Sequence, residues 1–313
     1  MYIIKQIPED FVVKEVSNIE VKEVGGYSYY RLKKKDYTTV KAVELVGNKL
    51  RVPVKNIGFA GSKDRRAVTE QMISIKNCNI KELVLDGIKI EFVGRGDVPI
   101  SLGELEGNEF EIVIREVEEK PEKLDKFVNY FGDQRFSKNN VEIGKLIVKK
   151  KFKDAAKLLV ENETNEKYSE YLAKNPNDSI GMLRKIPKKI LIMYVHAFQS
   201  YVWNESVKKL GGSVDKIPIV GFGTEFENGE VERVVEDILE KEDVSLRDFI
   251  IREIPELSSD GTERDVYVEI KDLEISGLED DELNKGKKKV KLKFKLNKGC
   301  YATEVVKALF ESN

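Results

Sequence analysis

Alternating apolar and polar residues predict β-strands near both ends of the chain. Residues 2–4, 11–16 and 27–32 read as extended segments, and Gly25-Gly26 marks the turn before the third. Further strands are expected at 57–60, 72–75, 88–93, 110–114, 266–270 and 290–296. The pattern therefore predicts a sheet that draws its strands from the two ends of the sequence.

Apolar residues at intervals of three and four predict helices, which gather in the middle of the chain. An early example runs from Val40 to Leu50, after a candidate N-cap at Thr38 or Thr39. Other helices are expected at 122–131, 143–160, 166–173, 193–210, 225–242 and 303–310. Because strands and helices follow each other without a regular βαβ repeat, the pattern predicts an α+β fold.

The change of pattern along the chain predicts two domains. Residues 1–140 and 266–313 are rich in strand signals, whereas residues 141–265 are mostly helical. We therefore expect one sheet domain whose chain is interrupted by a helix-rich insertion.

Few residue types are present that could carry metal or triad chemistry. His196 is the only histidine, and Cys78 and Cys300 are the only cysteines, with no CxxC pair. A multi-histidine metal site and a Cys-based zinc site are therefore not expected. No GxSxG motif precedes His196, so a Ser-His-Asp triad is not expected either. If the chain is an enzyme, its carboxylates and lysines must do the work.

The overall composition is typical of a soluble globular protein, with 41% hydrophobic and 35% charged residues and a net charge of −2. The longest apolar run, residues 190–195, is too short to cross a bilayer, and the N-terminus lacks the layout of a signal peptide. We therefore expect a cytoplasmic protein. Lysines cluster at 33–35, 149–151 and 285–295, which suits either nucleic-acid binding or an ordinary solvated surface.

The loop that holds Asp64 is the first candidate for chemistry. Its sequence neighbours Lys63, Arg65 and Arg66 are all cations. Nearby positive charge favours the ionised form of a carboxylate and also attracts phosphate. An ionised carboxylate in such a loop suits nucleophilic attack on a nucleotide.

Two other interpretations of this loop compete with a nucleophile. A phosphate-binding P-loop fails, because only two residues separate Gly58 from Gly61 and Asp64 stands where the P-loop needs a hydroxyl. A structural role, in which Asp64 closes a turn through its side chain, stays open. The glycines themselves are expected to supply backbone torsions that other residues resist.

Two segments near the ends of the chain carry further candidates. Lys5, Glu9 and Phe11 lie in the run KQIPEDF and could face one site, although an ordinary strand–turn–strand explains them equally well. Tyr301 follows a glycine in the run KGCYATEVV and precedes a predicted helix. Thr303 is the expected N-cap of that helix, which is compatible with a role for Tyr301.

The run NYFGDQRF at 129–136 combines aromatic rings, amides and a cation. Asn129 could pair with a base edge, and Phe131 could stack on a base. The alternative is a core aromatic cluster with a helix C-cap at Gly132. Both interpretations stay open on this segment alone.

Taken together, these segments resemble the TruD family of tRNA pseudouridine synthases. The matching runs are PEDFVV at 8–13, FAGSKDRRAVTEQ at 59–71, GNEF at 107–110, NYFGDQRF at 129–136 and GCYATEVV at 299–306. The resemblance implies a pseudouridine synthase catalytic domain, with a mixed, mainly antiparallel sheet flanked by helices. It also implies an inserted, helix-rich TRUD domain at about 141–265, with RNA in the cleft between the two domains.

The resemblance also implies roles for particular residues. The family's nucleophile falls on Asp64, and its supporting catalytic residues fall on Lys5 and Glu9. Its substrate-binding positions fall on Phe11, Asn129, Phe131 and Tyr301, and Phe131 would stack on the target base.

The implied reaction is the isomerisation of uridine 13, in the D-arm of tRNA, to pseudouridine. The implied partner is tRNA, with no metal, no nucleotide cofactor and no membrane. We expect a monomer, although nothing in the sequence fixes the oligomeric state. A tRNA-binding module without catalysis, using the same residues, is the alternative.

Overall fold

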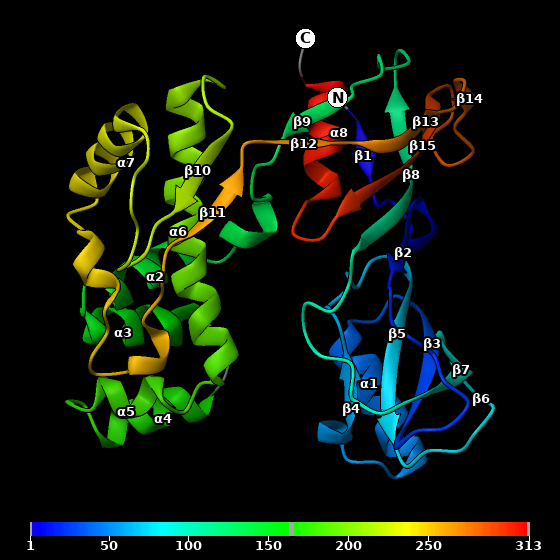
Figure 1. The fold of residues 1–313 in the computed structure, drawn as a ribbon, viewed down its shortest axis with the longest axis horizontal. Coiled ribbons are helices and arrows are strands. Elements are labelled where there is room, and N and C mark those ends of the chain that lie inside the picture. The colour runs from blue at the N-terminus through cyan, green and yellow to red at the C-terminus, as the bar shows by residue number, and fades with distance from the viewer. Residues whose placement is uncertain (1, 163–165, 312–313) are drawn as a thin grey trace. The chain divides into compact units, whose positions relative to one another are not determined.

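The computed structural model describes residues 2–162 and 166–311 and divides into two compact units (Figure 1). Unit 1 comprises residues 1–127 and 269–313, and unit 2 comprises residues 128–268. The middle of the chain is thus inserted into a unit built from both ends. Residues 128–140 and 266–268, which the sequence pattern placed with the sheet domain, belong to unit 2.

Unit 1 is built on one large sheet with the strand order β13-β15-β8-β2-β5-β3-β7-β6. Short strands β1, β14 and β4 pair with β8, β15 and β5 respectively. The bounds are β1 Ile3–Ile4, β2 Phe11–Val16, β3 Tyr27–Lys35, β4 Ile57–Phe59, β5 Val68–Lys76, β6 Glu82–Leu85, β7 Ile88–Gly96, β8 Gly107–Val117, β13 Lys271–Ile275, β14 Glu279–Asp280 and β15 Lys288–Asn297. Among the described strands, only the β2–β5 ladder of this sheet is parallel, so the expected mainly antiparallel α+β fold is confirmed.

Strand β15 joins the C-terminal part of the chain to the N-terminal part. It pairs with β8 along its whole length, with Val290 opposite Ile114 and Asn297 opposite Gly107. Alternate residues of β15 are buried, which is the pattern of a strand with one face toward the core. The expectation that both ends build one sheet is therefore confirmed.

Two helices cover unit 1. Helix α1 (Thr39–Leu50) begins at the N-cap Thr38, whose side chain accepts a hydrogen bond from the amide of Lys41. Its buried residues pack on the sheet in a cluster that includes Tyr30, Leu32, Ala42, Val43, Val46, Ile73, Ile75 and Ile90. Helix α8 (Ala302–Phe310) has Tyr301, not the predicted Thr303, at its N-cap. Short 3₁₀ helices lie at η1 (Pro8–Asp10) and η2 (Val54–Asn56).

Unit 2 is mostly helical and is organised around α6 (Lys188–Leu210), of which Phe198, Val202 and Trp203 are fully buried. The other helices are α2 Asn140–Val148, α3 Phe152–Asn162, α4 Glu166–Lys174, α5 Ser179–Leu183 and α7 Gly229–Lys241. Short 3₁₀ helices η3 (Asp133–Phe136), η4 (Leu246–Phe249) and η5 (Pro255–Leu257) connect them. Two short ladders complete the list of elements, β10 (Lys216–Ile219) with β11 (Thr262–Asp265), and β9 (Lys126–Val128) with β12 (Tyr267–Glu269).

Two helix predictions are wrong. The charged residues of 122–131 favour a helix, but this stretch contains strand β9, because pairing with β12 outweighs local propensity. The single helix predicted at 143–160 is two helices, α2 and α3. They separate at residues 149–151, where Lys150 has a positive φ of 57° that an α-helix cannot accommodate.

Gly58, in β4, and Gly61, in the loop before Asp64, differ in the space around them. Neither Gly58 nor Gly61 has a positive φ, so the expected special torsions are absent at both. A Cβ at Gly58 would lie 2.3 Å from the main-chain oxygen of Ile100, whereas a Cβ at Gly61 would meet nothing within 4 Å. Gly58 is therefore needed for the close approach of two backbone segments, and Gly61 is not.

We predict that Gly58→Ala destabilises the protein by about 1–3 kcal/mol, the usual penalty for overpacking. Gly61→Ala, three residues further along the chain, is the matched control and should leave stability unchanged or slightly raised, because alanine restricts the unfolded chain. The urea midpoint of unfolding measures both variants. Equal midpoints for the two variants would contradict this account of Gly58.

Candidate active site

The centre of the candidate site in unit 1 is an ion pair between Lys5 and Asp64. The Nζ of Lys5 lies 2.5 Å from Oδ2 of Asp64, and both side chains keep part of their surface exposed, 22% and 31% respectively. The same Nζ lies 4.0 Å from the centre of the Phe11 ring. The ammonium places a positive charge directly against the carboxylate, and the partial exposure of the carboxylate leaves it accessible to a ligand.

Lys5 reaches this position from an unusual backbone conformation. Its φ is 56°, in the left-handed region that lysine rarely occupies. Such conformations cluster at functional sites, where the surrounding structure holds them in place. The conformation directs Lys5, between β1 and η1, toward a carboxylate 59 positions away in the sequence.

The η1 segment that follows Lys5 is fixed by a buried ion network around Arg115. Its guanidinium donates to both carboxylate oxygens of Asp10, with Nε 3.0 and 2.9 Å away, and to Asp281 at 2.6 Å. Arg115 and Asp10 are almost fully buried. A fork-shaped guanidinium that bridges two carboxylates restricts the position of each. The segment that follows Lys5 is therefore fixed to β8 through Arg115.

The loop that carries Asp64 is held from beneath by a chain of hydrogen bonds. The amide of Lys63 donates to Oγ1 of Thr39 at 2.9 Å, and that hydroxyl donates to Oε1 of Gln71 at 2.8 Å. The Nε2 of Gln71 then donates to the main-chain oxygen of Gly61 at 2.9 Å. Because Thr39 and Gln71 are buried, these bonds are protected from water and fix the backbone of the loop.

The three cations beside Asp64 in sequence contact other groups. The side chain of Lys63 is buried and pairs with Glu15 at 3.0 Å. The Nε of Arg65 lies 3.8 Å from Asp36, and Arg66 donates to the main-chain oxygen of Gln6. The cation on the Asp64 carboxylate is therefore Lys5, from a distant part of the chain, rather than its sequence neighbours.

Lys34 provides a second cation close to Asp64. It is 2% exposed, and its Nζ donates to the main-chain oxygen of Asp64 at 2.7 Å. Burial lowers the pKa of Lys34 to about 8, although attraction to Asp64 opposes this effect. The sequence pattern did not identify Lys34, because it stands in a run of three lysines that reads as a solvated surface.

Two other predicted residues of unit 1 lie in less decisive positions. Glu9 pairs with Lys35, whose hydrogen bond lowers the pKa of this exposed carboxyl. In the described part of the chain, the ion-pair partner of Glu9 is therefore Lys35 rather than Lys5 or Asp64. Tyr301 is half-buried at the start of α8, where its main-chain oxygen accepts a hydrogen bond from the amide of Glu304.

In unit 2, Asn129 is engaged at both ends of its amide. Its Oδ1 accepts a hydrogen bond from Nη2 of Arg264 at 2.7 Å, and its Nδ2 donates to the main-chain oxygen of Asp265 at 3.2 Å. Arg264 also donates to the main-chain oxygen of Asn129. In this structure the side chain of Asn129 therefore holds Arg264 in place.

Phe131 lies in an aromatic cluster of unit 2. The Cζ of Arg264 lies 4.0 Å from the centre of the Phe131 ring, and the ring of Trp203 meets it edge-on with centroids 5.7 Å apart. Asn204 donates to the main-chain oxygen of Phe131 and accepts from its amide, both at 3.0 Å. Arg264 thus contacts both Asn129 and Phe131, the two predicted RNA-binding residues of this unit. It was missed because it lies in a run, GTERD, with no motif.

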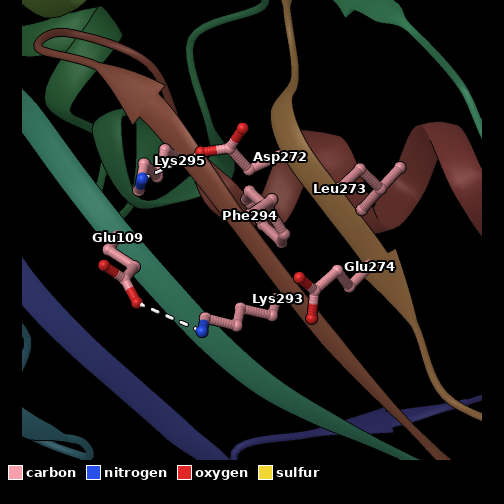
Figure 2. A pocket seen from close by; sticks show the side chains of 7 residues that line it. All are labelled: Glu109, Asp272, Leu273, Glu274, Lys293, Phe294 and Lys295. Atoms are coloured by element: carbon pink, nitrogen blue, oxygen red, sulfur yellow. Dashed lines mark hydrogen bonds and ion pairs between the residues drawn. The ribbon is translucent and has the colours of Figure 1, made fainter.

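The pocket in Figure 2 lies apart from the predicted residues. Its charged side chains are Glu109, Asp272, Glu274, Lys293 and Lys295, and it also contains Leu273 and Phe294. Lys295 pairs with Asp272 at 2.8 Å and Lys293 with Glu109 at 3.8 Å. Because its carboxylates outnumber its lysines, the pocket does not favour a phosphate ligand.

Among residues 2–162 and 166–311, no helix has both the length and the apolar character needed to cross a membrane. Within the same ranges, no three His, Cys, Asp or Glu side chains are grouped as metal ligands.

We predict that Asn204→Ala destabilises unit 2, because it removes two buried hydrogen bonds to the main chain of Phe131, at about 1–3 kcal/mol for each bond. Asn175→Ala is a suitable control, since exposed Asn175 makes a single side-chain hydrogen bond, to the main-chain oxygen of Tyr171. Urea unfolding followed by the fluorescence of Trp203, the only tryptophan, reports on this unit. Similar midpoints for the two variants would show that the Asn204 hydrogen bonds contribute little.

Comparison with known proteins gives a consistent result along the whole chain. The family model for TruD, tRNA pseudouridine synthase D, matches residues 2–171, 164–216 and 210–309. A protein of Aquifex aeolicus named tRNA pseudouridine synthase D is 30% identical, over 99% of this chain and 98% of its own. A Methanosarcina mazei protein named a probable tRNA pseudouridine synthase D is also 30% identical, over 99% and 93%.

A solved structure agrees with these sequence matches. It is a crystal structure described as a tRNA pseudouridine synthase D (TruD) from Methanosarcina mazei. It superposes with a TM-score of 0.74 at 28% identity, covering 99% of this chain and 93% of the other.

Proposed function

Since the chain belongs to the TruD family of tRNA pseudouridine synthases, we propose that it isomerises uridine 13 in the D-arm of tRNA, with Asp64 as the nucleophile. The observation that carries the role of Asp64 is its 2.5 Å ion pair with Lys5, which leaves the carboxylate partly exposed. Lys5 thus holds a positive charge against the carboxylate that would act as nucleophile or base.

Pseudouridine formation breaks the N1–C1′ bond, turns the uracil and joins C5 to C1′. The proton lost from C5 is balanced by the proton that N1 gains, so the reaction is an isomerisation that consumes no second substrate. Asp64 can serve by attacking C1′, by adding to C6 of the base or by removing the C2′ proton. Each of these routes uses the Asp64 carboxylate, which Lys5 holds in place through the ion pair.

Substrate binding in unit 1 is assigned to Phe11 and Tyr301, with Lys5 and Glu9 in support. Phe11 is 3% exposed, and the ammonium of Lys5 lies over its ring. Phe11 therefore contributes by holding the Lys5 cation in position beside the target base, through a cation–π contact. Tyr301 offers an aromatic ring near the start of α8. Glu9 supports the site indirectly, through its ion pair with Lys35.

Unit 2 contributes Asn129 and Phe131 to RNA binding, together with Arg264. The target uridine must leave its stack to reach a carboxylate, which costs a few kcal/mol. Stacking on aromatic rings or on a guanidinium plane can offset this by roughly 1–3 kcal/mol per base. The guanidinium of Arg264 on the Phe131 ring supplies such a surface.

We predict that Asp64→Asn lowers turnover by roughly 10⁴-fold or more, the scale seen when a nucleophile is removed, while tRNA binding persists. The control is Asp36→Asn, which makes the same substitution at a carboxylate 3.8 Å from Arg65. Pseudouridine formation on a tRNA transcript and tRNA binding are measured for both variants.

Two outcomes would contradict this assignment. Near-normal turnover by Asp64→Asn would show that another group is the nucleophile. If the wild-type protein binds tRNA but forms no pseudouridine on any transcript, the alternative of a tRNA-binding module without catalysis would be favoured instead.

The position of modification is tested separately. A transcript with uridine 13 should gain one pseudouridine at that position, and a transcript with cytidine there should gain none, because cytosine is not a substrate for this isomerisation. Chemical mapping of pseudouridine along each transcript reads out both results. Modification elsewhere in the cytidine-13 transcript would show that the specificity for position 13 is wrong.

A further inference from the structure

Lys34 occupies a position in the sheet that is ordinarily apolar. Along β3, residues Tyr30, Leu32 and Lys34 are buried on one face, while residues 31, 33 and 35 are exposed. The first two belong to the apolar cluster beneath α1. Lysine is almost never fully buried unless it is paired. The strand therefore places an ammonium where its own alternation calls for a hydrophobic side chain.

The buried ammonium has an incomplete set of partners. Among the described residues its Nζ donates one hydrogen bond, to the main-chain oxygen of Asp64 at 2.7 Å, although an ammonium can donate three. In the described part of the chain, no carboxylate lies within ion-pairing distance of its Nζ. Lys63 makes a useful contrast, because its side chain is only 7% exposed but pairs with Glu15 at 3.0 Å.

The charged groups that act on Lys34 come from one loop. Asp64 attracts it and Lys63 repels it, whereas its cross-strand neighbours, Thr69 on β5 and Ile88 on β7, carry no charge. Removing an ammonium from water is unfavourable unless a partner compensates. Lys34 therefore destabilises the fold in its charged form, and a purely structural role does not explain its presence.

We propose that Lys34 is a positioning residue for the proposed reaction, whose ammonium holds the main chain of Asp64 and adds positive charge beneath that carboxylate. This role rests on the proposed function. Lys5 contacts the carboxylate from the accessible side, and Lys34 contacts the backbone of the same residue from the core. Displacement of a catalytic group by about 1 Å can lower a rate by roughly 100-fold, so a fixed backbone at Asp64 bears directly on turnover.

The lowered pKa of Lys34, about 8, gives this proposal a signature in stability. A lysine whose pKa is lower in the folded than in the unfolded state destabilises the fold wherever it is charged, below about pH 8. This penalty disappears as the pH rises from about 8 toward the unfolded pKa of about 10.4. The wild-type protein should therefore gain stability over that interval relative to a variant without the charge.

The test uses Lys34→Met, which keeps the length and volume of the side chain and removes its charge and hydrogen bond. At pH 7 its Tm should equal or exceed that of the wild type, because replacing a buried charge by an apolar side chain of similar size is often stabilising. Its kcat on tRNA should fall by roughly 10- to 100-fold, with KM within about threefold. The Tm of the variant relative to that of the wild type should fall as the pH is raised from 7 to 10, because the wild type gains stability over this interval.

Two further variants complete the experiment. Lys63→Met should lower the Tm at pH 7, because it leaves the buried carboxylate of Glu15 unpaired. Lys34→Arg keeps a cation that can donate to the same main-chain oxygen, and it should recover part of the kcat lost in Lys34→Met.

The opposite outcomes overturn the proposal. If Lys34→Met has the wild-type kcat, the residue does not position Asp64. If the variant has a lowered Tm and loses activity only in proportion to its unfolded fraction, Lys34 is structural. A wild-type protein that forms no pseudouridine contradicts the proposed function and, with it, the role of Lys34, whereas an active wild type with an equally active variant contradicts the role of Lys34 alone.

Discussion

The ion pair between Lys5 and Asp64 is the contact that the rest of unit 1 is arranged to hold. Each partner sits on a short irregular segment that could not keep its position alone. The segment of Lys5 is anchored through Asp10 to buried Arg115, and the loop of Asp64 is anchored through Thr39 and Gln71. The large sheet therefore positions two segments that are distant in sequence so that Nζ of Lys5 lies 2.5 Å from Oδ2 of Asp64.

The electrostatics of the site depend on where cations are buried rather than on how many there are. The whole chain carries a net charge of −2, and surface lysines such as Lys288 and Lys295 pair with acids, so its total charge gives no reason to expect an RNA partner. Around Asp64 the arrangement is different, because Lys5 contacts its carboxylate and Lys34 contacts its main-chain oxygen. A carboxylate in such a setting is preorganised for work on a polyanionic substrate.

Much of the fold could be predicted because its signals are local. The alternation in β15 and the spacing in α1 each survive in the structure, since both elements have one apolar and one polar face. Strand β9 was missed because it is short and gains its stability from pairing with β12, which no local pattern reports. The break between α2 and α3 depends on a positive φ at Lys150, a residue with no special preference for it.

The candidate site could be predicted only in part, for a related reason. Motifs identified Asp64 and Lys5 separately, and their contact follows from the fold. The sequence neighbours Lys63, Arg65 and Arg66 were expected to surround Asp64, but each is drawn to another partner. Lys34 was hidden in a lysine run, since burial of one member cannot be read from composition. Gly58 was recognised for its torsion, yet what it provides is space beside Ile100.

The two units contribute different kinds of chemistry. Unit 1 holds an aspartate whose carboxylate contacts Lys5 and whose main-chain oxygen contacts Lys34, and unit 2 holds a guanidinium on an aromatic ring, with Asn129 fixing its orientation. The first arrangement suits reaction at a sugar or base, and the second suits stacking with an unpaired base. Membership of the TruD family is consistent with both arrangements.

The claim that Asp64 carries out the chemistry is tested most directly under single-turnover conditions. Excess protein is mixed with a tRNA transcript labelled with tritium at C5 of its uridines, so that each isomerisation releases tritium to water. The account predicts release by the wild-type protein and none above background by Asp64→Asn, although both bind the transcript. Release by the variant at a rate within roughly tenfold of the wild type, a barrier difference of only about 1.4 kcal/mol, would contradict it.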